Sequence, residues 1–140
     1  VFMIQKEVAD RILDEKSPTL LSWEVKIFGA PSKVRDVKPS SFFPSPKVES
    51  AVLKIQVFKT PLVPDQDMKS FFELLFTAYR QPRKTILNNL TASGRFSKET
   101  VISLLQKISI DPKLRPHQLS LQQWRSMLRE AFQQESPNTP

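Results

Sequence analysis

The sequence contains no cysteine, only two glycines and a single histidine among its 140 residues. Without cysteine, the chain has no disulfide, no thiolate zinc ligand and no cysteine nucleophile. Two isolated glycines, Gly29 and Gly94, cannot make a glycine-rich phosphate loop or a dinucleotide fingerprint. His117 lies in a proline-flanked loop, where a lone histidine is more often a surface residue than a metal ligand or acid–base catalyst. We therefore expect no metal site, no cofactor-binding residue and no catalytic residue within this chain.

Long apolar runs are also absent, since none approaches the roughly 18 residues of a membrane-spanning helix. The N-terminus shows no basic-then-apolar secretory signal. Hydrophobic residues make up 39% and charged residues 25% of the chain, which is typical of a globular protein. We expect a cytoplasmic protein without a membrane partner, and the lack of cysteine suits that reducing compartment.

Acidic residues are missing from one long stretch of this basic chain, whose formal net charge is +7. No aspartate or glutamate lies between Glu73 and Glu99. The basic residues of this stretch are Arg80, Arg83, Lys84, Arg95 and Lys98. A surface that follows phosphates needs such a one-signed stretch. A solvated basic helix face would have the same composition, so charge alone leaves both interpretations open.

The first part of the chain has the pattern of mixed strand and helix. Val1 to Ile4 predicts the end of a buried strand, and because this run does not begin with Met we expect that an upstream part is missing. Gln5 to Leu13 predicts a helix. The alternation in Trp23 to Ile27 predicts a half-buried strand, and that in Ala51 to Val57 predicts another. Pro39 to Pro46 is too rich in proline for a helix or a central strand.

The second part of the chain has a helical pattern throughout. The expected apolar stripe of its first helix consists of Met68, Phe72, Leu75, Phe76 and Tyr79. Pro82 can serve as the first residue of the next helix, since its missing N–H is not needed there. Ser97 is a plausible N-cap, and Ser120 with Gln123 fits a capping box. We expect four segments: a mixed part at 1–60, a linker at 61–67, a helical domain at 68–133 and a frayed tail at 134–140.

One segment between the predicted strands combines aromatic rings, prolines and a lysine. Prolines stiffen this loop, and Phe42 and Phe43 lie near its tip. A rigid loop that presents an aromatic ring suits the stacking of an extruded base, and Lys47 could hold a neighbouring phosphate. Physical reasoning alone favours a plainer role, in which the aromatic rings cap the edge of the sheet.

This loop also resembles a motif of the ribosomal RNA adenine dimethyltransferase family, close to Phe-x-Pro-x-Pro-Lys-Val-x-Ser-Ala-Val. The matching residues are Phe42, Pro44, Pro46, Lys47, Val48, Ser50, Ala51 and Val52. Further blocks agree in the same order. Met3 to Arg11 resembles the segment after the family's catalytic motif, and Phe76 to Thr85, with Asn88 and Leu90, resembles its helical-domain signature. Ile110 to Pro112 with Arg115 resembles its last recurring piece.

The resemblance implies the C-terminal portion of a class I, Rossmann-like α/β methyltransferase domain followed by a small all-α domain. It implies transfer of methyl groups from S-adenosylmethionine to N6 of two adjacent adenosines near the 3′ end of small-subunit rRNA. The cofactor and the catalytic Asn-Leu-Pro-Tyr-type motif would belong to the missing upstream half, so we expect the chain alone to be inactive. The implied partners are small-subunit rRNA and the immature small ribosomal subunit, bound by a monomer.

The site residues implied by the resemblance form two groups. The acceptor-base loop would comprise Phe42, Phe43, Pro44, Pro46 and Lys47, with Phe42 packing on the base. The rRNA-binding residues would be Arg80, Arg83, Lys84, Asn88 and Arg95.

The sequence departs from the family pattern in two places. Thr19-Leu20 replaces the usual Tyr-Gly, and Pro82 replaces a common arginine, which removes one possible phosphate contact. Two alternatives stay open. One is a non-catalytic RNA-binding or transcription-factor relative of the same fold. The other is a related 23S rRNA resistance methylase, against which the Gln81 to Thr85 stretch argues.

Overall fold

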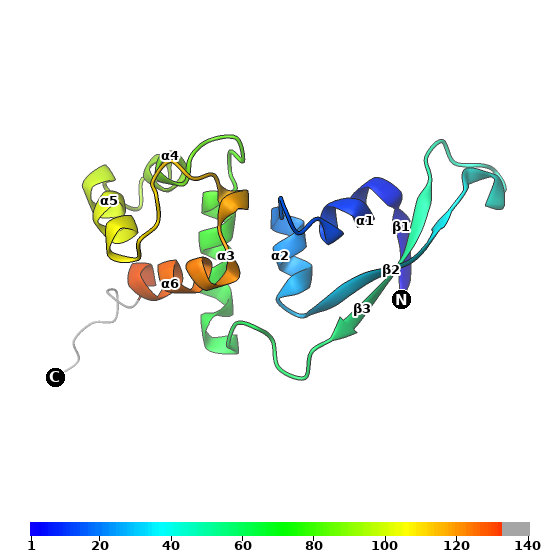
Figure 1. Ribbon diagram of the computed structural model, residues 1–140, viewed down its shortest axis with the longest axis horizontal. Coiled ribbons are helices and arrows are strands. Elements are labelled where there is room, and N and C mark those ends of the chain that lie inside the picture. The colour runs from blue at the N-terminus through cyan, green and yellow to red at the C-terminus, as the bar shows by residue number, and fades with distance from the viewer. Residues whose placement is uncertain (133–140) are drawn as a thin grey trace. The chain divides into compact units, whose positions relative to one another are not determined.

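The computed structural model describes residues 1–132, and the chain divides into two compact units (Figure 1). The N-terminal unit is Val1–Leu62, and the helical unit begins at Val63. The elements of the N-terminal unit are β1 (Phe2–Gln5), α1 (Lys6–Leu13), α2 (Leu20–Lys26), β2 (Gly29–Val37), the 3₁₀ turn η1 (Pro39–Ser41) and β3 (Ser50–Val57).

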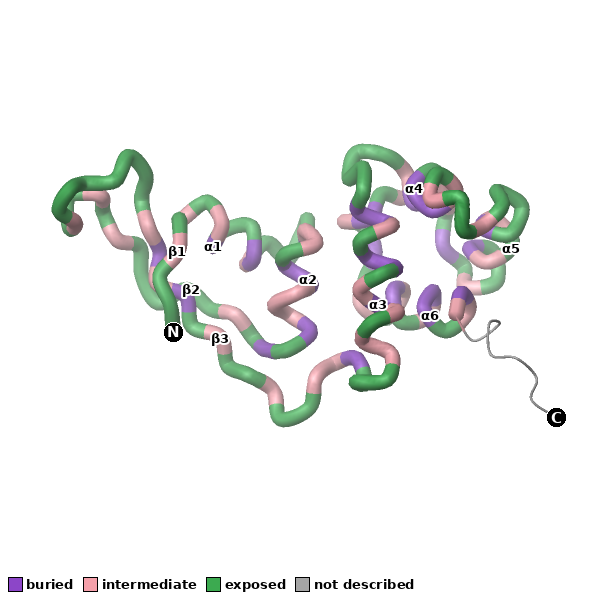
Figure 2. The backbone as a smooth tube through the Cα atoms, turned by 180° about the vertical axis from the view of Figure 1, so that it is seen from behind, coloured by how far each residue is buried: buried purple, intermediate pink, exposed green. Residues whose placement is uncertain are grey.

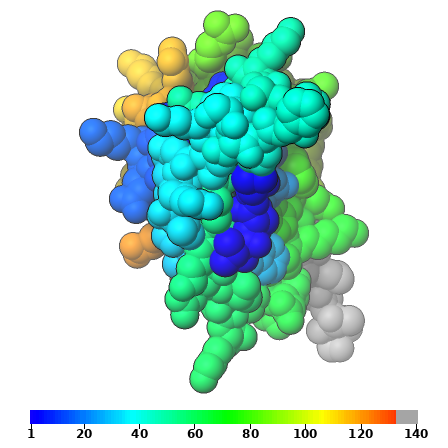
Figure 3. Space-filling model, turned by 90° about the vertical axis from the view of Figure 1, so that its right-hand side faces the viewer, coloured from blue at the N-terminus to red at the C-terminus, as the bar shows by residue number. Residues whose placement is uncertain are grey.

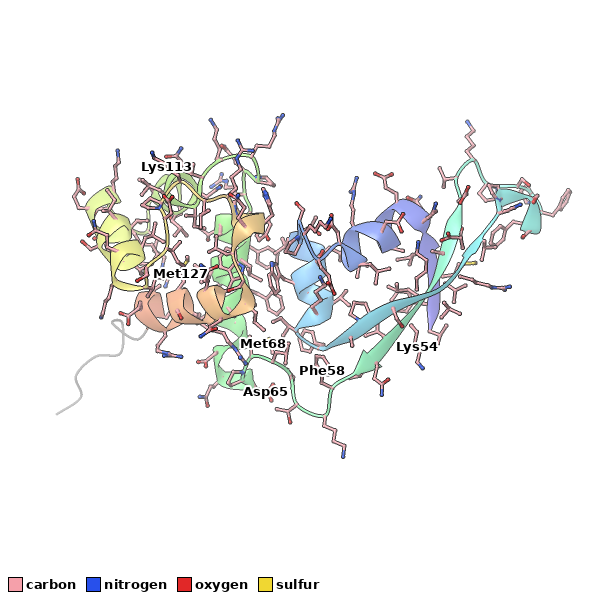
Figure 4. The ribbon with its side chains drawn as sticks, in the orientation of Figure 1. Lys54, Phe58, Asp65, Met68, Lys113 and Met127 are labelled. Carbon is pink, nitrogen blue, oxygen red and sulfur yellow. The ribbon has the colours of Figure 1, made fainter. Side chains whose placement is uncertain are left out.

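The sheet of the N-terminal unit has the strand order β1-β3-β2, and both pairings are antiparallel. Helix α1 covers one face of this sheet, where Ala9 and Ile12 form a buried cluster with Ala51 and Leu53. Lys54 lies on β3 and points away from α1 (Figure 4). The predicted helix at Gln5 to Leu13 and the predicted strand at Ala51 to Val57 are therefore confirmed. The apolar alternation at positions 51 and 53 correctly predicts the face of the sheet that α1 covers.

Strand β1 forms where it was predicted, but the expectation that it is buried was wrong. Phe2 is 43% exposed and Met3 49% exposed. Within the described residues β1 pairs with β3 and with no second strand, so one edge of it stays open. A continuous apolar run indicates a buried strand only when both faces of the sheet are covered at that strand.

The predicted strand at Trp23 to Ile27 was wrong, because these residues belong to helix α2 and its C-cap. Thr19 and Ser22 form a capping box, with the Ser22 N–H donating to Thr19 Oγ1 at 3.3 Å and the Thr19 N–H donating to Ser22 Oγ at 3.0 Å. Trp23 and Ile27 are four residues apart, so both lie on one helix face and both are buried. Residues spaced by two fit a helix as well as a strand when the run is this short.

Strand β2 was not predicted, since its charged residues and Pro31 hide the strand pattern. It is an edge strand, where charges and proline are tolerated. Its first residue, Gly29, has a structural reason to be glycine: an added Cβ would lie 2.7 Å from Gln56 O. Strands β2 and β3 make a long hairpin that carries the loop at 38–49 at its end, away from α2 (Figure 1).

The helical unit is built from α3 (Asp65–Ala78), α4 (Ile86–Ala92), α5 (Lys98–Lys107), the 3₁₀ turn η2 (Pro116–Gln118) and α6 (Leu121–Phe132). Its buried residues gather where these helices face one another (Figure 2). The fully buried side chains include Phe71, Leu75, Ile86, Leu105, Trp124 and Met127. Met127 lies inside this unit (Figure 4), and the Trp124 ring stacks on Tyr79 at 6.0 Å between centroids.

Two predictions about α3 need correction. The buried stripe of α3 agrees with the predicted one at Leu75 and Tyr79, which are buried. It differs elsewhere, because Phe76 is 52% exposed and the other buried residues are Phe71, Leu74 and Ala78. Helix α3 also begins at Asp65, inside the segment expected as a linker, with Asp65 and Asp67 in its first turn (Asp65 is labelled in Figure 4). Carboxylates there interact favourably with the helix dipole.

Pro82 does not start the next helix, which was predicted wrongly. Thr85 is the N-cap of α4 and accepts a hydrogen bond from the Asn88 N–H, so Pro82 lies in the preceding turn. The other predicted caps are confirmed. Ser97 caps α5, and Ser120 with Gln123 forms the expected reciprocal pair, at 2.9 and 3.2 Å. The predicted tail at 134–140 lies outside the described residues.

Candidate nucleic-acid interface

The loop at residues 38–49 has a framework of local hydrogen bonds. The pairing of Val37 with Ser50 closes it at its base. Within it, the Phe42 N–H donates to Pro39 O at 3.1 Å, and the Ser45 hydroxyl lies 2.9 Å from Pro39 O and 3.3 Å from Phe42 O. These bonds fix the backbone on both sides of Phe42. Ser45 was not singled out from the sequence, because its role depends on the folded loop.

The two aromatic residues of the loop differ sharply in exposure. Phe43 is 102% exposed, whereas Phe42 is half-buried. The loop, coloured cyan to turquoise, forms a projecting rim of the face that Figure 3 shows, and β1 is visible below it in dark blue. Most of the loop backbone is exposed in Figure 2. The fully exposed ring is thus that of Phe43, which is adjacent to Phe42, the residue that matches the family motif.

The remaining predicted loop residues, Pro44, Pro46 and Lys47, are all exposed. The loop's acid, Glu49, lies 3.7 Å from Lys6 Nζ, and the Lys6 N–H donates to Glu49 O at 3.0 Å. The start of α1 therefore holds the end of the loop and offsets its negative charge. Lys47 remains exposed on the same loop, which makes the local field favourable for an anion.

A buried amide organises the turn between α3 and α4. Asn89 is 4% exposed, and its Nδ2 donates toward Gln81 O, Lys84 O and Thr85 O at 3.0 to 3.3 Å. Its Oδ1 accepts the Gln81 N–H at 2.9 Å. One side chain thereby fixes both ends of the turn that carries Arg83. Sequence reasoning selected Asn88 and missed Asn89, since only the folded turn distinguishes these adjacent amides.

An open pocket of about 420 Å³ adjoins this turn. Its lining residues are Gln81, Lys84, Asn88, Thr91, Ala92 and Lys98. Two lysines and no acid face this space, and Thr91 Oγ1 is a buried oxygen without a hydrogen-bond partner in the described structure. Amide, hydroxyl and ammonium groups are the donors that bind phosphate oxygens. Two of the predicted rRNA-binding residues, Lys84 and Asn88, meet here, and the structure adds Lys98 and Thr91.

The other predicted rRNA-binding residues lie in different surroundings. Arg80 and Arg83 are exposed. Arg95 is engaged within the protein: its guanidinium lies 3.7 Å from a Glu73 oxygen and 4.4 Å from the centroid of the Phe132 ring. Such contacts restrain the side chain and offset part of its charge. The side chain of Arg95 therefore makes contacts within the protein that the side chains of the other four predicted residues do not make in the described structure.

An ionic cluster ties α1 to β2 near the base of the hairpin. Lys33 Nζ lies 2.7 Å from Asp10 Oδ1 and 3.2 Å from Asp36 Oδ1. The hydrogen bond from Lys33 holds the pKa of Asp10 below its ordinary value, and the bonds to Asp10 and then Asp36 raise the pKa of Lys33. All three groups are on the surface, so the cluster positions elements and contributes modestly to stability.

Two further kinds of feature are absent from residues 1–132. That part of the chain holds no group of three or more histidine, cysteine or acidic residues arranged to hold a metal ion. It also has no helix with the length and apolar character needed to cross a bilayer.

The sequence matches one known family over most of its length. The family described as ribosomal RNA adenine dimethylase matches residues 1–111. The chain belongs to this family. The residues matched include the whole loop at 38–49, the turn that Asn89 fixes, and the pocket beside it.

Curated relatives of this family member carry a consistent name. A ribosomal RNA small subunit methyltransferase A from Dehalococcoides mccartyi is 36% identical over 131 residues, which cover 93% of this chain and 45% of the relative. The Staphylococcus haemolyticus protein of the same name is 38% identical over 136 residues, covering 93% and 46%. The chain therefore spans a little under half the length of the relatives it matches.

Solved structures support the same grouping. A dimethyladenosine transferase from Plasmodium falciparum superposes with a TM-score of 0.72 at 25% identity, covering 91% of this chain and 55% of that one. The 23S rRNA methyltransferase ErmE superposes with a TM-score of 0.62 at 17% identity, covering 91% and 52%. The second likeness shows the fold alone. This family member thus has a methyltransferase fold.

Proposed function

We propose that this chain is part of an S-adenosylmethionine-dependent methyltransferase that dimethylates N6 of two adjacent adenosines near the 3′ end of small-subunit rRNA during ribosome biogenesis. The observation that carries this proposal is the match to small-subunit rRNA methyltransferases over 93% of the chain. The geometry of the loop at 38–49 supports it, and so does that of the basic turn, the turn between α3 and α4 that carries Arg80, Arg83 and Lys84. Both are suited to RNA.

In this proposal, the N-terminal unit is the C-terminal portion of a class I, Rossmann-like methyltransferase domain, and the helical unit is its rRNA-binding domain. The open edge of β1 and the exposed Phe2 and Met3 support the first assignment, since a further strand would pair with that edge and elements packed on the sheet would cover these side chains. We assign residues 1–60 to the methyltransferase domain and begin the helical domain at Asp65, where α3 starts, which leaves 61–64 as the linker.

The acceptor base is the group that the N-terminal unit would receive. Adenine N6 is a weak nucleophile because its lone pair is delocalised into the ring, so the reaction depends on positioning the base. The base must also leave its stack to be reached. Phe42, at the motif position, would pack on the extruded adenine, and the hydrogen bonds at Pro39 and Ser45 would hold that ring in place. Lys47 would bind a neighbouring phosphate.

Residues 1–132 contain no glycine-rich loop of the kind that would hold S-adenosylmethionine, which the family implies as methyl donor. Neither glycine belongs to a glycine-rich loop: Gly29 is used for close strand pairing, and Gly94 has a φ of +74° in the turn after α4. We therefore assign cofactor binding and the catalytic motif to the portion of the relatives that this chain does not cover. The residues of this chain would position the acceptor base and the rRNA.

The helical unit would hold the rRNA backbone through its exposed cations. Arg80, Arg83 and Lys84 supply charge, and the pocket beside the turn offers Asn88 and Lys98 for a phosphate. Such contacts fix the register of the RNA and do not read its sequence. The partner would be the immature small ribosomal subunit, bound in the cytoplasm by a monomer.

A non-catalytic relative of the same fold is less well supported, because the relatives matched are named as methyltransferases. Action on 23S rRNA is also less well supported. The ErmE likeness is a likeness of fold at 17% identity, whereas the small-subunit enzymes match at 36% to 38%.

Methyl transfer by the complete gene product tests the proposal. Purified protein is incubated with labelled S-adenosylmethionine and small subunits that lack the modification. We expect label in the rRNA with the wild-type protein, and a loss of about 100-fold or more in rate with Phe42→Ala, because a misplaced reacting group costs that much. Val57→Ala, which truncates an exposed residue outside the loop, is the control and should retain the wild-type rate. Absence of label with the wild-type protein would refute the enzyme function.

A further inference from the structure

Phe43 presents a complete aromatic ring to solvent at the tip of a stiff loop. Its exposure of 102% is higher than that of any other large apolar residue in the part of the chain described, where Val1 follows at 83%. A single exposed apolar residue is ordinary on a protein surface. Phe43 differs because it adjoins Phe42 and because Pro44 and Pro46 restrict the chain beside it.

The surroundings of Phe43 suit a nucleic acid better than an apolar partner. Lys38 and Lys47 lie on the same loop and are exposed, and its acid, Glu49, is paired with Lys6. An exposed ring among cations is the arrangement by which proteins hold unpaired nucleotides, since every base has a face that can stack. The loop projects on the face shown in Figure 3.

We propose that Phe43 is a stacking platform for an unpaired nucleotide next to the acceptor base, while Phe42 packs on the acceptor base itself. This inference rests on the proposed function. Extruding one of two adjacent adenosines removes a stacking neighbour from the other. The ring of Phe43 replaces that neighbour and keeps the strand in register beside the loop. Phe42 and Phe43 thus hold consecutive nucleotides, with one ring half-buried and one fully exposed.

Three variants separate stacking from other contacts. Binding of the complete gene product to a short, protein-free rRNA oligonucleotide containing the two adenosines is measured for wild type, Phe43→Ala, Phe43→Leu and Phe43→Trp. We expect Phe43→Ala and Phe43→Leu to raise Kd about tenfold and Phe43→Trp to retain wild-type affinity, because only an aromatic face stacks on a base. The matched control is Val57→Ala, another exposed apolar truncation in the N-terminal unit, which should leave Kd unchanged.

Fluorescence provides a second readout. The native tryptophans are shielded, with Trp23 8% and Trp124 0% exposed, so the indole of Phe43→Trp is the solvent-exposed one among residues 1–132. Its emission should be quenched when the oligonucleotide binds. Val57→Trp should show no such quenching.

The inference is overturned if Phe43→Ala binds the oligonucleotide as wild type does, or if Phe43→Leu does, since an apolar side chain would then suffice. It is also overturned if Phe43→Ala weakens binding to whole subunits only, which would indicate a contact with ribosomal protein. Methyl transfer by the wild-type protein tests the proposed function separately. If Phe43→Ala transfers methyl groups as fast as wild type, only the stacking role of Phe43 is rejected.

Discussion

Asn89 shows how one residue can control a functional surface that it does not join. Its amide satisfies backbone groups at Gln81, Lys84 and Thr85, while Arg83 and Lys84 point to solvent from the turn so fixed. A buried amide with this many partners is costly to remove, because each abandoned group loses its hydrogen bond without gaining water.

Asn89→Ala should lower the free energy of unfolding of the chain by about 2 kcal/mol, since buried backbone groups are left unsatisfied. Urea denaturation followed by circular dichroism measures this change. Asn88→Ala is the matched control: it removes the same amide from an exposed neighbour and should change stability by less than about 0.5 kcal/mol. Equal effects of the two substitutions would contradict the role of Asn89.

The pair of Asp10 and Lys33 makes a pH-dependent contribution. The folded pKa of Asp10 is below 3.8, so its stabilisation is complete above that value and is lost as pH falls through the lower folded pKa. The folded pKa of Lys33 is above 10.5, so its share is complete below 10.5 and is lost as pH rises through the higher folded pKa.

Asp10→Asn should therefore be less stable than wild type between about pH 5 and pH 9, and the two should converge in strong acid. Denaturant unfolding at pH 7 and below the folded pKa of Asp10 gives the comparison. Glu15→Gln removes an exposed carboxylate from the same unit as the control. A difference between wild type and Asp10→Asn that persists unchanged in acid would show that the ion pair is not its source.

At the scale of elements, the fold was predictable where a pattern had one physical cause. Helix α1 and strand β3 followed from apolar periodicity, and the caps at Ser97 and Ser120 from residue type. Strand β2 was not predicted, because it is stabilised by pairing with β3 and its own charged residues do not have a strand pattern. The apolar alternation at Trp23 to Ile27 had two possible causes, and the cap before it decided for a helix.

Helix α2 should depend on that cap. Thr19→Ala removes the oxygen that accepts the Ser22 N–H and should cost about 1 kcal/mol of stability. Thr19→Ser keeps the oxygen and should cost much less. Thermal unfolding of the two variants gives the comparison, and an equal loss in both would mean that the methyl group of Thr19, and not its cap, stabilises α2.

At the scale of the whole molecule, the candidate site was predictable in its members and not in its organisation. The resemblance to the dimethyltransferase family selected the loop at 38–49 and the basic turn. It could not show that Phe43 is fully exposed, that Arg95 contacts Phe132, or that Lys98 joins Lys84 at one pocket. Those facts depend on how separate segments pack, which composition and spacing do not contain.

The net charge of +7 predicts salt-dependent RNA binding by the chain. Replacing Arg83 and Lys84 together with alanine should reduce the slope of log K against log salt concentration by about 2, since each phosphate contact adds roughly one. Arg95→Ala should change the slope little, because Glu73 already offsets its charge. Fluorescence anisotropy over a range of salt concentrations measures both. An RNA affinity that does not change with salt concentration would contradict the proposed phosphate contacts.

The identity of the methylated nucleotides tests the central claim most directly. Unmodified small subunits are treated with the complete gene product and S-adenosylmethionine, and the rRNA is mapped by mass spectrometry. The account predicts N6,N6-dimethyladenosine at two adjacent positions near the 3′ end of the small-subunit rRNA. Rejection would follow from no methyl groups on that rRNA, or from methylation of 23S rRNA alone.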